Sequence, residues 1–188
     1  MDIKIDNLCK SYGENIVLQN VSKELKQGSV CLLTGASGTG KTTLLHILLG
    51  LVLPDCGTFT QGVRYSAVFQ ENRLLPRKTP VENLKLIATK DTKKAELLAL
   101  LEEILPADCL QLPVEQLSGG MQRRVAIARA MLAESDCVVM DEPFTGLDDE
   151  TAQTVIAFII KLLRGRTLLL STHRPELMEK LQTEQITL

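Results

Sequence analysis

A short apolar segment followed by a glycine-rich run constrains the fold more than any other feature of the chain. Residues 30–34 are apolar on both faces, as in a buried parallel strand, and residues 41–50 have a helical pattern that stops at Gly50 and Pro54. The run between them reads Gly35-Ala36-Ser37-Gly38-Thr39-Gly40-Lys41-Thr42. A strand, a glycine loop and a helix in this order are typical of a loop whose backbone N–H groups hold phosphate. We therefore predict that residues 35–43, Thr43 included, bind the phosphates of ATP, with Lys41 at the β- and γ-phosphates and the Thr42 hydroxyl on Mg²⁺.

A second apolar stretch brings two acidic residues to the end of a predicted strand. Residues 136–141 form the strand, and Asp141 and Glu142 close it. Because the carboxyl ends of parallel strands meet at one edge of a sheet, we expect both carboxylates beside the glycine-rich loop. Asp141 would then hold Mg²⁺ through its water shell, and Glu142 would polarise an attacking water as general base. An ordinary acidic turn before Pro143 is the alternative interpretation.

The run Leu117-Ser118-Gly119-Gly120 opens a predicted helix over residues 119–133. The Ser118 hydroxyl and the two glycine amides would lie at the positive end of that helix, which favours a second anion site. One chain does not need two γ-phosphate sites for one nucleotide, so we expect this site to serve the ATP of a second copy. A two-fold, head-to-tail dimer would then bury two ATP molecules. A helix start that is merely capped is the alternative.

The remaining pattern predicts an α/β fold. Strands are expected at 2–6, 16–25, 30–34, 58–60, 63–70, 136–141 and 167–172, and helices at 41–50, 97–105, 119–133, 151–164 and 175–181. Alternation of strands and helices at both ends indicates a mainly parallel sheet. The helical stretch 71–130 interrupts it, so we expect a single domain over 1–188, with a core of about 1–70 and 131–188 and an inserted helical subdomain of about 71–130.

Composition narrows the classes of function. A net charge of −2 and only two Tyr, four Phe and no Trp argue against nucleic acid as a partner. The five cysteines are scattered, so we expect neither a disulfide framework nor a zinc site, and Cys31 and Cys137 should be small buried apolar residues. The amino-terminal residues do not form a signal-peptide pattern, and no apolar run approaches membrane-spanning length. We expect a cytoplasmic protein.

Together, and in this order, these motifs resemble those of the ATP-binding cassette ATPases, the nucleotide-binding subunits of ABC transporters. The resemblance covers essentially the whole chain and implies a P-loop NTPase fold: a RecA-like, mainly parallel sheet, a small antiparallel portion and a helical subdomain. It also implies hydrolysis of ATP with Mg²⁺. Four residues receive roles from the resemblance alone: Tyr12 stacks on adenine, Gln70 contacts Mg²⁺ and the attacking water, Asp148 crosses the dimer interface, and His173 binds the γ-phosphate and orients Glu142.

The resemblance also implies partners. These are a second copy or a homologous ATPase in the ATP-bound state, integral membrane permease subunits on the inner face of the membrane and, as a further candidate, a solute-binding protein. Residues 71–76 are the expected docking strip for the permease, and they look like the corresponding segment of importers of nitrate and sulfonates. The chain departs from the family in a shorter segment between Gly50 and Gln70 and in Gln122-Arg123-Arg124, where relatives more often have Arg-Gln-Arg.

Two other functions remain open at this level. A soluble ABC ATPase of the DNA-repair or translation type would share every motif, but such relatives carry long coiled coils, zinc hooks or paired cassettes. A small-molecule kinase would share the phosphate loop but would need neither the Ser118 motif nor Glu142.

Overall fold

The structure is a computed structural model that describes residues 1–178 and 183–188. The chain separates into two compact units. We call residues 1–67, 135–142 and 165–188 the core unit and residues 68–134 and 143–164 the helical unit. The helical unit thus also contains residues 143–164, which the expected boundaries place in the core.

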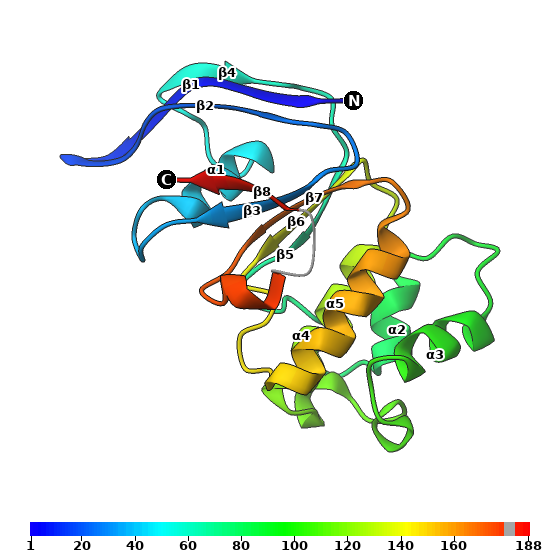
Figure 1. Ribbon diagram of the computed structural model, residues 1–188. Coiled ribbons are helices and arrows are strands. Elements are labelled where there is room, and N and C mark those ends of the chain that lie inside the picture. The colour runs from blue at the N-terminus through cyan, green and yellow to red at the C-terminus, as the bar shows by residue number, and fades with distance from the viewer. Residues whose placement is uncertain (179–182) are drawn as a thin grey trace. The chain divides into compact units, whose positions relative to one another are not determined.

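A five-stranded sheet forms the centre of the core unit, in the order β5-β6-β7-β3-β8 (Figure 1). Its strands are β3 (Val30–Thr34), β5 (Tyr65–Val68), β6 (Cys137–Asp141), β7 (Thr167–Ser171) and β8 (Thr183–Thr187). β3 pairs in parallel with β7 and β8, and β6 pairs in parallel with β7. Every residue of β6 and β7 is buried, as the apolar runs predict for a parallel sheet. The mainly parallel sheet is therefore confirmed.

A smaller antiparallel sheet has the order β2-β1-β4, with β1 at Ile3–Tyr12, β2 at Asn15–Leu25 and β4 at Cys56–Phe59. Alternation of Ile3 and Ile5, which are buried, with Lys4 and Asp6, which are exposed, gives β1 one apolar face. That face packs in a common core with Leu44 and other residues of helix α1 (Lys41–Leu48).

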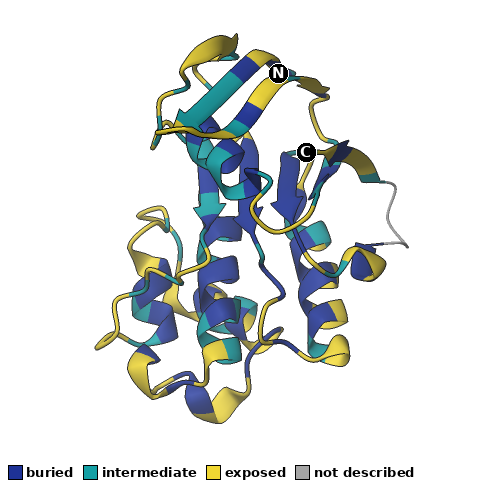
Figure 2. Ribbon diagram, turned by 90° about the vertical axis from the view of Figure 1, so that its left-hand side faces the viewer, coloured by how far each residue is buried: buried dark blue, intermediate teal, exposed yellow. Residues whose placement is uncertain are grey.

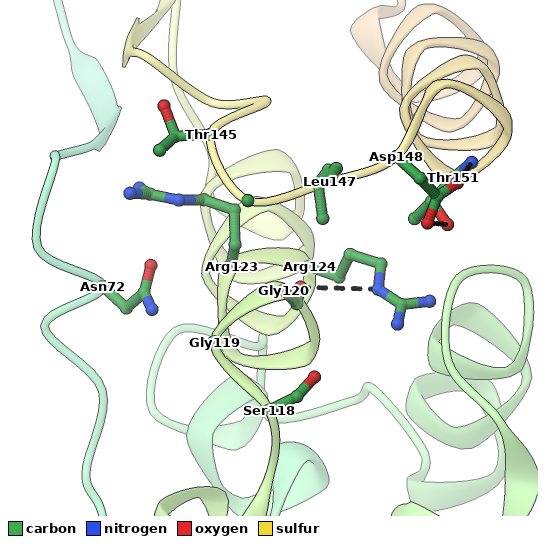
Figure 3. A pocket seen from close by; sticks show the side chains of 11 residues that line it. Asn72, Ser118, Gly119, Gly120, Arg123, Arg124, Thr145, Leu147, Asp148 and Thr151 are labelled. Carbon is green, nitrogen blue, oxygen red and sulfur yellow. Dashed lines mark hydrogen bonds between the residues drawn. The ribbon is translucent and has the colours of Figure 1, made fainter.

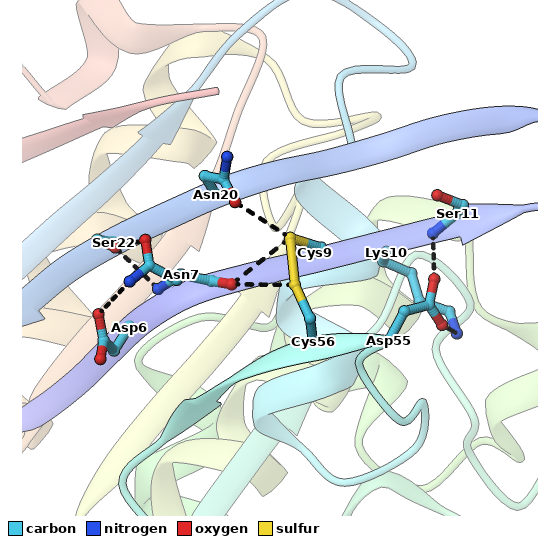
Figure 4. The surroundings of a disulfide bond; sticks show 9 residues. All are labelled: Asp6, Asn7, Cys9, Lys10, Ser11, Asn20, Ser22, Asp55 and Cys56. Carbon is cyan, nitrogen blue, oxygen red and sulfur yellow. Dashed lines mark hydrogen bonds and ion pairs between the residues drawn. A yellow bond between two sulfur atoms is a disulfide. The ribbon is translucent and has the colours of Figure 1, made fainter.

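The structure joins Cys9 and Cys56 in a disulfide, a single bridge that the expectation of no disulfide framework did not foresee. The two cysteines are direct partners on the antiparallel strands β1 and β4, with a Cα–Cα distance of 5.0 Å (Figure 4). The carbonyl oxygen of Asn7, at a bulge in β1, lies 3.4 Å from the Cys56 sulfur. Linear spacing could not indicate this pairing, because a strand register brings the two residues together. Cys31 and Cys137 are free and buried, as expected, and burial raises the pKa of the Cys137 thiol to about 12.

The helical unit contains α2 (Pro80–Lys85), α3 (Lys94–Glu102), α4 (Gly119–Leu132) and α5 (Asp149–Leu163). Each of three helices begins at a residue whose side chain accepts a backbone N–H: Thr79 for α2, in a capping box with Glu82, Ser118 for α4 and Asp148 for α5. Figure 2 shows the buried faces of these helices as dark bands beside exposed ones. Short 3-10 helices lie at Ala107–Cys109 and Val114–Gln116 in this unit, and at Pro175–Met178 in the core unit.

The predicted elements agree with the structure where a regular pattern of apolar residues continues over the whole element. β3 has the expected bounds, and α1, α4, α5, β6 and β7 differ from theirs by one to three residues. The strand β8 was not predicted, because its polar sequence has only Ile186 buried. The helix expected over 175–181 is a 3-10 helix as far as Met178, and its remainder lies outside the described residues. In the described part of the chain, no helix has the length and apolar character needed to cross a membrane.

The disulfide gives a direct test of the β1–β4 register. Denatured protein prepared without reductant should show three free thiols, those of Cys31, Cys109 and Cys137. Because the bridge closes a loop of 47 residues, reduction should lower the free energy of unfolding by about 2–4 kcal/mol. Chemical denaturation with and without reductant measures this loss. Cys56→Ser should abolish the sensitivity to reductant, Cys109→Ser should retain it, and five reactive thiols in the untreated protein would contradict the pairing.

Candidate active site

The phosphate loop runs from the end of β3 to the start of α1 in the core unit. Gly40 has a φ of +94°, and a Cβ there would lie 2.7 Å from the Val17 carbonyl oxygen, so no other residue fits. The ammonium of Lys41 donates to the carbonyl oxygens of Gly35 at 2.8 Å and Ala36 at 2.9 Å. Lys41 is only 7% exposed. The two carbonyl groups therefore hold the Lys41 ammonium over the loop, and a phosphate group could replace them as its hydrogen-bond acceptors.

The amino terminus of α1 is left open to an anion. Gly40 precedes the helix and supplies no side-chain cap, and the first turn contains no acidic residue. The N–H groups of such a first turn have no partner within the helix and form a positive end. α3 also has no side-chain cap, but its first turn contains Glu96, so of these two helices only α1 begins without either a cap or a carboxylate, as a phosphate-binding loop requires.

Asp141, at the end of β6, ties the loop to the sheet. Its Oδ2 accepts from the Thr42 hydroxyl at 2.7 Å, and its Oδ1 accepts from the Ser171 hydroxyl at 2.6 Å. Asp141 is 4% exposed, and Ser171 is fully buried beside it on β7, in parallel register. The structure thus brings the predicted pair Thr42 and Asp141 together. The role of Ser171 was not predicted; a hydroxyl side chain directly after the apolar run 168–170 was its signal.

Glu142 has an unusual backbone and an unusual carboxylate. Its φ of 51° lies in the left-handed region, which side chains other than glycine seldom adopt. The Glu142 N–H donates to both the carbonyl and the hydroxyl oxygen of Ser171, each at 3.2 Å. Its Oε2 accepts from the His173 N–H at 3.1 Å. Its Oε1 is buried without a hydrogen bond, and the His173 Nε2 lies 3.4 Å away.

Tyr12 ends β1 and is 52% exposed, an available surface for an aromatic base. The Lys10 ammonium lies 5.5 Å from the centre of its ring and also pairs with Asp55 at 2.6 Å. The adenine role of Tyr12 remains a prediction.

The helical unit contains a separate pocket of about 580 Å³ at the start of α4 (Figure 3). The residues that line it are Asn72, Ser118, Gly119, Gly120, Arg123, Arg124, Thr145, Gly146, Leu147, Asp148 and Thr151. The Ser118 hydroxyl accepts from the Met121 N–H at 3.2 Å and so begins the helix. Two arginines and the amino end of α4, where Ser118 caps one N–H group, make this pocket suited to an anion. Sequence reasoning found Ser118, Gly119, Gly120 and Asp148 here, but not the arginines, Asn72 or the threonines.

Asp148 has a structural task in the same pocket. Its carboxylate accepts from the Thr151 N–H at 2.8 Å and the Thr151 hydroxyl at 2.9 Å, and these bonds begin α5. The Thr151 N–H is also the main reason why the pKa of Asp148 is lowered. Figure 3 shows Arg124 extending from α4 on the side of Asp148, while Arg123 leaves the helix on the opposite side.

Gln70 also belongs to the helical unit, and it is exposed. Its carbonyl oxygen accepts from Arg123. Its predicted contact with Mg²⁺ and water remains a prediction.

Three features define a P-loop nucleotide-binding protein. A buried parallel strand leads into a glycine loop, the ammonium of Lys41 lies over that loop, and Asp141 accepts a hydrogen bond from Thr42. The family model of the ABC transporter matches residues 18–145. The chain therefore belongs to the ABC transporter family, and the predicted membership is confirmed.

Two curated relatives illustrate the range of the family. The chain is 41% identical over 148 residues to the aliphatic sulfonates import ATP-binding protein SsuB 1 of Nocardia farcinica, covering 78% of this chain and 60% of the relative. It is 34% identical over 200 residues to the Nod factor export ATP-binding protein I of Ralstonia nicotianae, covering 97% of this chain and 62% of the relative. The chain thus spans about three-fifths of the length of these relatives.

Solved structures support the fold. A dimeric structure of an ATP-binding cassette in a post-hydrolysis state, bound to ADP and Pi, matches with a TM-score of 0.81 and 28% identity, covering 93% of this chain and 89% of that one. A second dimeric structure, described as a bacterial ABC transporter cassette, matches with a TM-score of 0.83 and 28% identity, covering 98% and 94% of the two chains. The predicted P-loop NTPase fold class is confirmed.

Removal of the Ser171 hydroxyl tests the bonds around Asp141. Ser171→Ala leaves the buried Asp141 Oδ1 without its donor, so the free energy of unfolding should fall by about 1–3 kcal/mol. Affinity for Mg-ATP should fall as well, because Asp141 loses its orientation. Urea denaturation and nucleotide titration measure the two effects. Ser22→Ala, which removes an exposed hydroxyl, is the control, and a Ser171→Ala variant as stable as that control would contradict the network.

Proposed function

We propose that this chain is the ATP-binding and ATP-hydrolysing subunit of an ABC transporter. One observation carries the proposal: the Glu142 carboxylate is fixed through one oxygen while its other oxygen is buried without a hydrogen bond. A buried, unsatisfied carboxylate oxygen costs free energy, so it is retained where a ligand completes it. An ordered water is the partner that a general base for hydrolysis requires. This arrangement favours hydrolysis over phosphoryl transfer to a second substrate.

In this proposal the glycine loop binds the triphosphate. The N–H groups of residues 35–43 face the phosphate oxygens, and the Lys41 ammonium exchanges the carbonyls of Gly35 and Ala36 for the β- and γ-phosphates. The exchange replaces neutral acceptors with charged ones, which form stronger hydrogen bonds to an ammonium. Tyr12 would stack on the adenine ring.

The residues around Asp141 fit Mg²⁺. Thr42 and Asp141 present hydroxyl and carboxylate oxygens within one hydrogen bond of each other, and oxygen is the ligand that Mg²⁺ prefers. No group of three His, Cys, Asp or Glu side chains that could hold a metal occurs among residues 1–178 and 183–188. That is consistent with an ion bound mainly by phosphates and water. When bound, Mg²⁺ neutralises phosphate charge; Gln70 is the further ligand that the resemblance suggests.

Hydrolysis then uses Glu142 and His173. The Glu142 Oε1 takes a proton from water as the water oxygen forms its bond to the γ-phosphorus, and the bond from that phosphorus to the bridging oxygen of ADP breaks. ADP keeps the bonding electron pair, and phosphate leaves. The backbone N–H of His173 holds Oε2 so that Oε1 faces the water. The imidazole of His173, whose Nε2 lies 3.4 Å from Oε1, donates to the γ-phosphate.

The pocket around Ser118 supports a dimer. It is suited to an anion, and nothing in the hydrolysis scheme above needs a second phosphate site in the same chain. We therefore infer that Ser118, Gly119, Gly120 and Asp148 contact the ATP of a second copy or of a homologous ATPase. Both solved cassettes described above are dimeric.

A membrane permease is the proposed partner of the dimer, because the curated relatives are named as ATP-binding proteins of import and export systems. The docking strip at 71–76 includes Leu75, which is 43% exposed. Its backbone N–H and carbonyl bond the buried Asn83 side chain, so the strip has a fixed shape for a partner to fit. If the transporter is an importer, we further propose a solute-binding protein as a partner. The dimer would then lie on the inner face of the membrane.

Glu142→Gln tests the reaction. The amide keeps the shape of the carboxylate but cannot accept the proton, so ATP turnover should fall by about 10²–10⁴-fold while binding persists. The trapped complex should then double in mass from 20.7 kDa with Mg-ATP. Phosphate release and light scattering measure the two effects. Lys41→Ala should lose ATP binding and stay monomeric, and a Glu142→Gln variant with wild-type turnover would overturn the assignment.

Gly119→Ala tests the Ser118 pocket without disturbing the fold. A Cβ at Gly119 meets nothing within 4 Å, whereas one at Gly120 would lie 3.2 Å from the Gly146 carbonyl oxygen. The variant should therefore unfold as the wild type does and bind ATP as a monomer with unchanged affinity. The added methyl group would block the approach of the second copy's phosphate, so dimer formation and turnover should fall by about tenfold or more. Normal dimerisation would show that the pocket does not meet ATP.

A further inference from the structure

All three arginines of α4 donate hydrogen bonds to backbone carbonyl oxygens of the helical unit. Most of these carbonyls belong to other segments, and one belongs to the preceding turn of α4 itself. Arg124 reaches the carbonyls of Gly120 and Ile104. Arg123 and Arg129 both reach the segment 69–73, which contains Gln70. The proposed function gives this last pair no role, although it joins the helix of the Ser118 pocket to the segment of a predicted catalytic residue.

Arg123 bonds two consecutive residues of that segment. Its two terminal nitrogens donate to the carbonyl oxygens of Phe69 and Gln70, one to each. The side chain is only 6% exposed, so these bonds form away from solvent. A guanidinium holds its N–H groups in one rigid plane, and two parallel donors therefore fix the orientation as well as the position of the peptide they bond.

Arg129 bonds the continuation of the same segment. Its Nη2 donates to the Asn72 carbonyl at 3.3 Å and its Nη1 to the Arg73 carbonyl at 2.9 Å. Arg73 has a φ of 47°, and its guanidinium carbon lies 3.7 Å from the centre of the Phe69 ring. The bonds from Arg129 and this ring contact stabilise a left-handed turn that would otherwise be unfavourable.

The segment is therefore fixed along its backbone, while the side chain of its second residue, Gln70, is exposed. Four of the five carbonyls from Phe69 to Arg73 accept from α4, and Gln70 itself is exposed. Further along, Asn72 lines the Ser118 pocket, and its side-chain oxygen is buried without a hydrogen bond. Buried polar atoms usually have a partner, so this Asn72 oxygen is available to a group that binds in the pocket.

We propose that Arg123 and Arg129 are positioning residues that make α4 and the Gln70 segment one rigid element, so that whatever binds at Ser118 also sets the place of Gln70. This inference rests on the proposed function, since it gives the coupling a purpose. ATP of the second copy at the amino end of α4 would act on the whole helix, and the two arginines would carry the displacement to Gln70. Rigid secondary structure and hydrogen-bonded side chains are the means by which such coupling travels.

Hydrogen exchange of the full-length protein tests the structural half of the proposal. Arg123→Gln should accelerate exchange of the backbone amides in 69–74 by about tenfold or more, while those of 125–132 stay within about twofold of the wild type. Arg123→Lys, which has one ammonium in place of a fork, should give an intermediate value. Lys161→Gln is the control, because it removes an exposed ion pair with Glu103 in the same unit and should leave 69–74 unchanged. Exchange that is unchanged in 69–74, or equally faster in 125–132, would overturn the proposal.

Kinetics tests the functional half. Arg123→Gln should lower kcat by about tenfold with KM for ATP within about twofold, since the variant disturbs Gln70 and leaves the phosphate loop intact. In a Gln70→Ala background the same substitution should cause no further loss, because Arg123 acts through Gln70. Losses that multiply would contradict that route. A wild type that hydrolyses no ATP would defeat the proposed function, whereas the exchange experiment would still decide whether the two arginines hold the segment.

Discussion

The Asp141 carboxylate is the interaction on which the rest of the core unit depends. Its two oxygens accept from Thr42, one residue after the loop lysine, and from Ser171 on the adjacent strand. A buried carboxylate is costly unless such donors satisfy it, so β6, β7 and the start of α1 are held in one arrangement. Ser171 also accepts the Glu142 N–H, and Glu142 in turn accepts from His173. The proposed sites of nucleotide binding and hydrolysis therefore share one chain of hydrogen bonds, which extends from Thr42 to His173, two residues after the end of β7.

Sequence reasoning succeeded where a local pattern carries the information. The apolar run of β3, the glycine loop and the helix start at Gly119 are each specified by residues adjacent in the chain, and the structure has all three. It failed where contacts join distant segments. The Cys9–Cys56 disulfide depends on the register of β1 with β4, and the bonds from Arg123 to Phe69 and Gln70 depend on how α4 packs. The polar strand β8 has one buried residue, so its pairing with β3 leaves almost no periodic signal. For Tyr12 and Gln70, the resemblance supplied a role that side-chain geometry does not by itself assign.

Helix α4 illustrates how one helix can contribute both a binding site, at its amino end, and positioning residues, along its length. At its amino end, Ser118 accepts one backbone N–H and Gly119 leaves open space where a side chain would stand. Along its length, arginines satisfy carbonyls that irregular backbone leaves without partners. Burial lowers the pKa of Arg124 and Arg129, because removing a guanidinium from water disfavours its charged form. The unperturbed pKa of a guanidinium is so high that both side chains remain charged. In a weakly polarisable environment, backbone carbonyl groups then form strong hydrogen bonds with these charged side chains. An apolar helix could pack equally well, but it could not fix the segment at 69–73.

Glu142 combines two features that sequence rules would exclude. The residue before a proline favours extended backbone, and a left-handed φ is unfavourable for any side chain with a Cβ, yet Glu142 precedes Pro143 and has a φ of 51°. Its Oε1 is also buried without a hydrogen bond. Each feature costs stability, and two sets of hydrogen bonds in the core unit offset this cost: the Glu142 N–H donates to Ser171, and the Glu142 carboxylate accepts from the backbone N–H of His173. Strain of this kind persists when the surrounding structure enforces it, and one of the enforcing residues here, Ser171, also bonds Asp141. The hydrogen bond from Ser171 to Asp141 thus belongs to the same network that orients Glu142, and the residue with the strained backbone is the one on which the proposed chemistry depends.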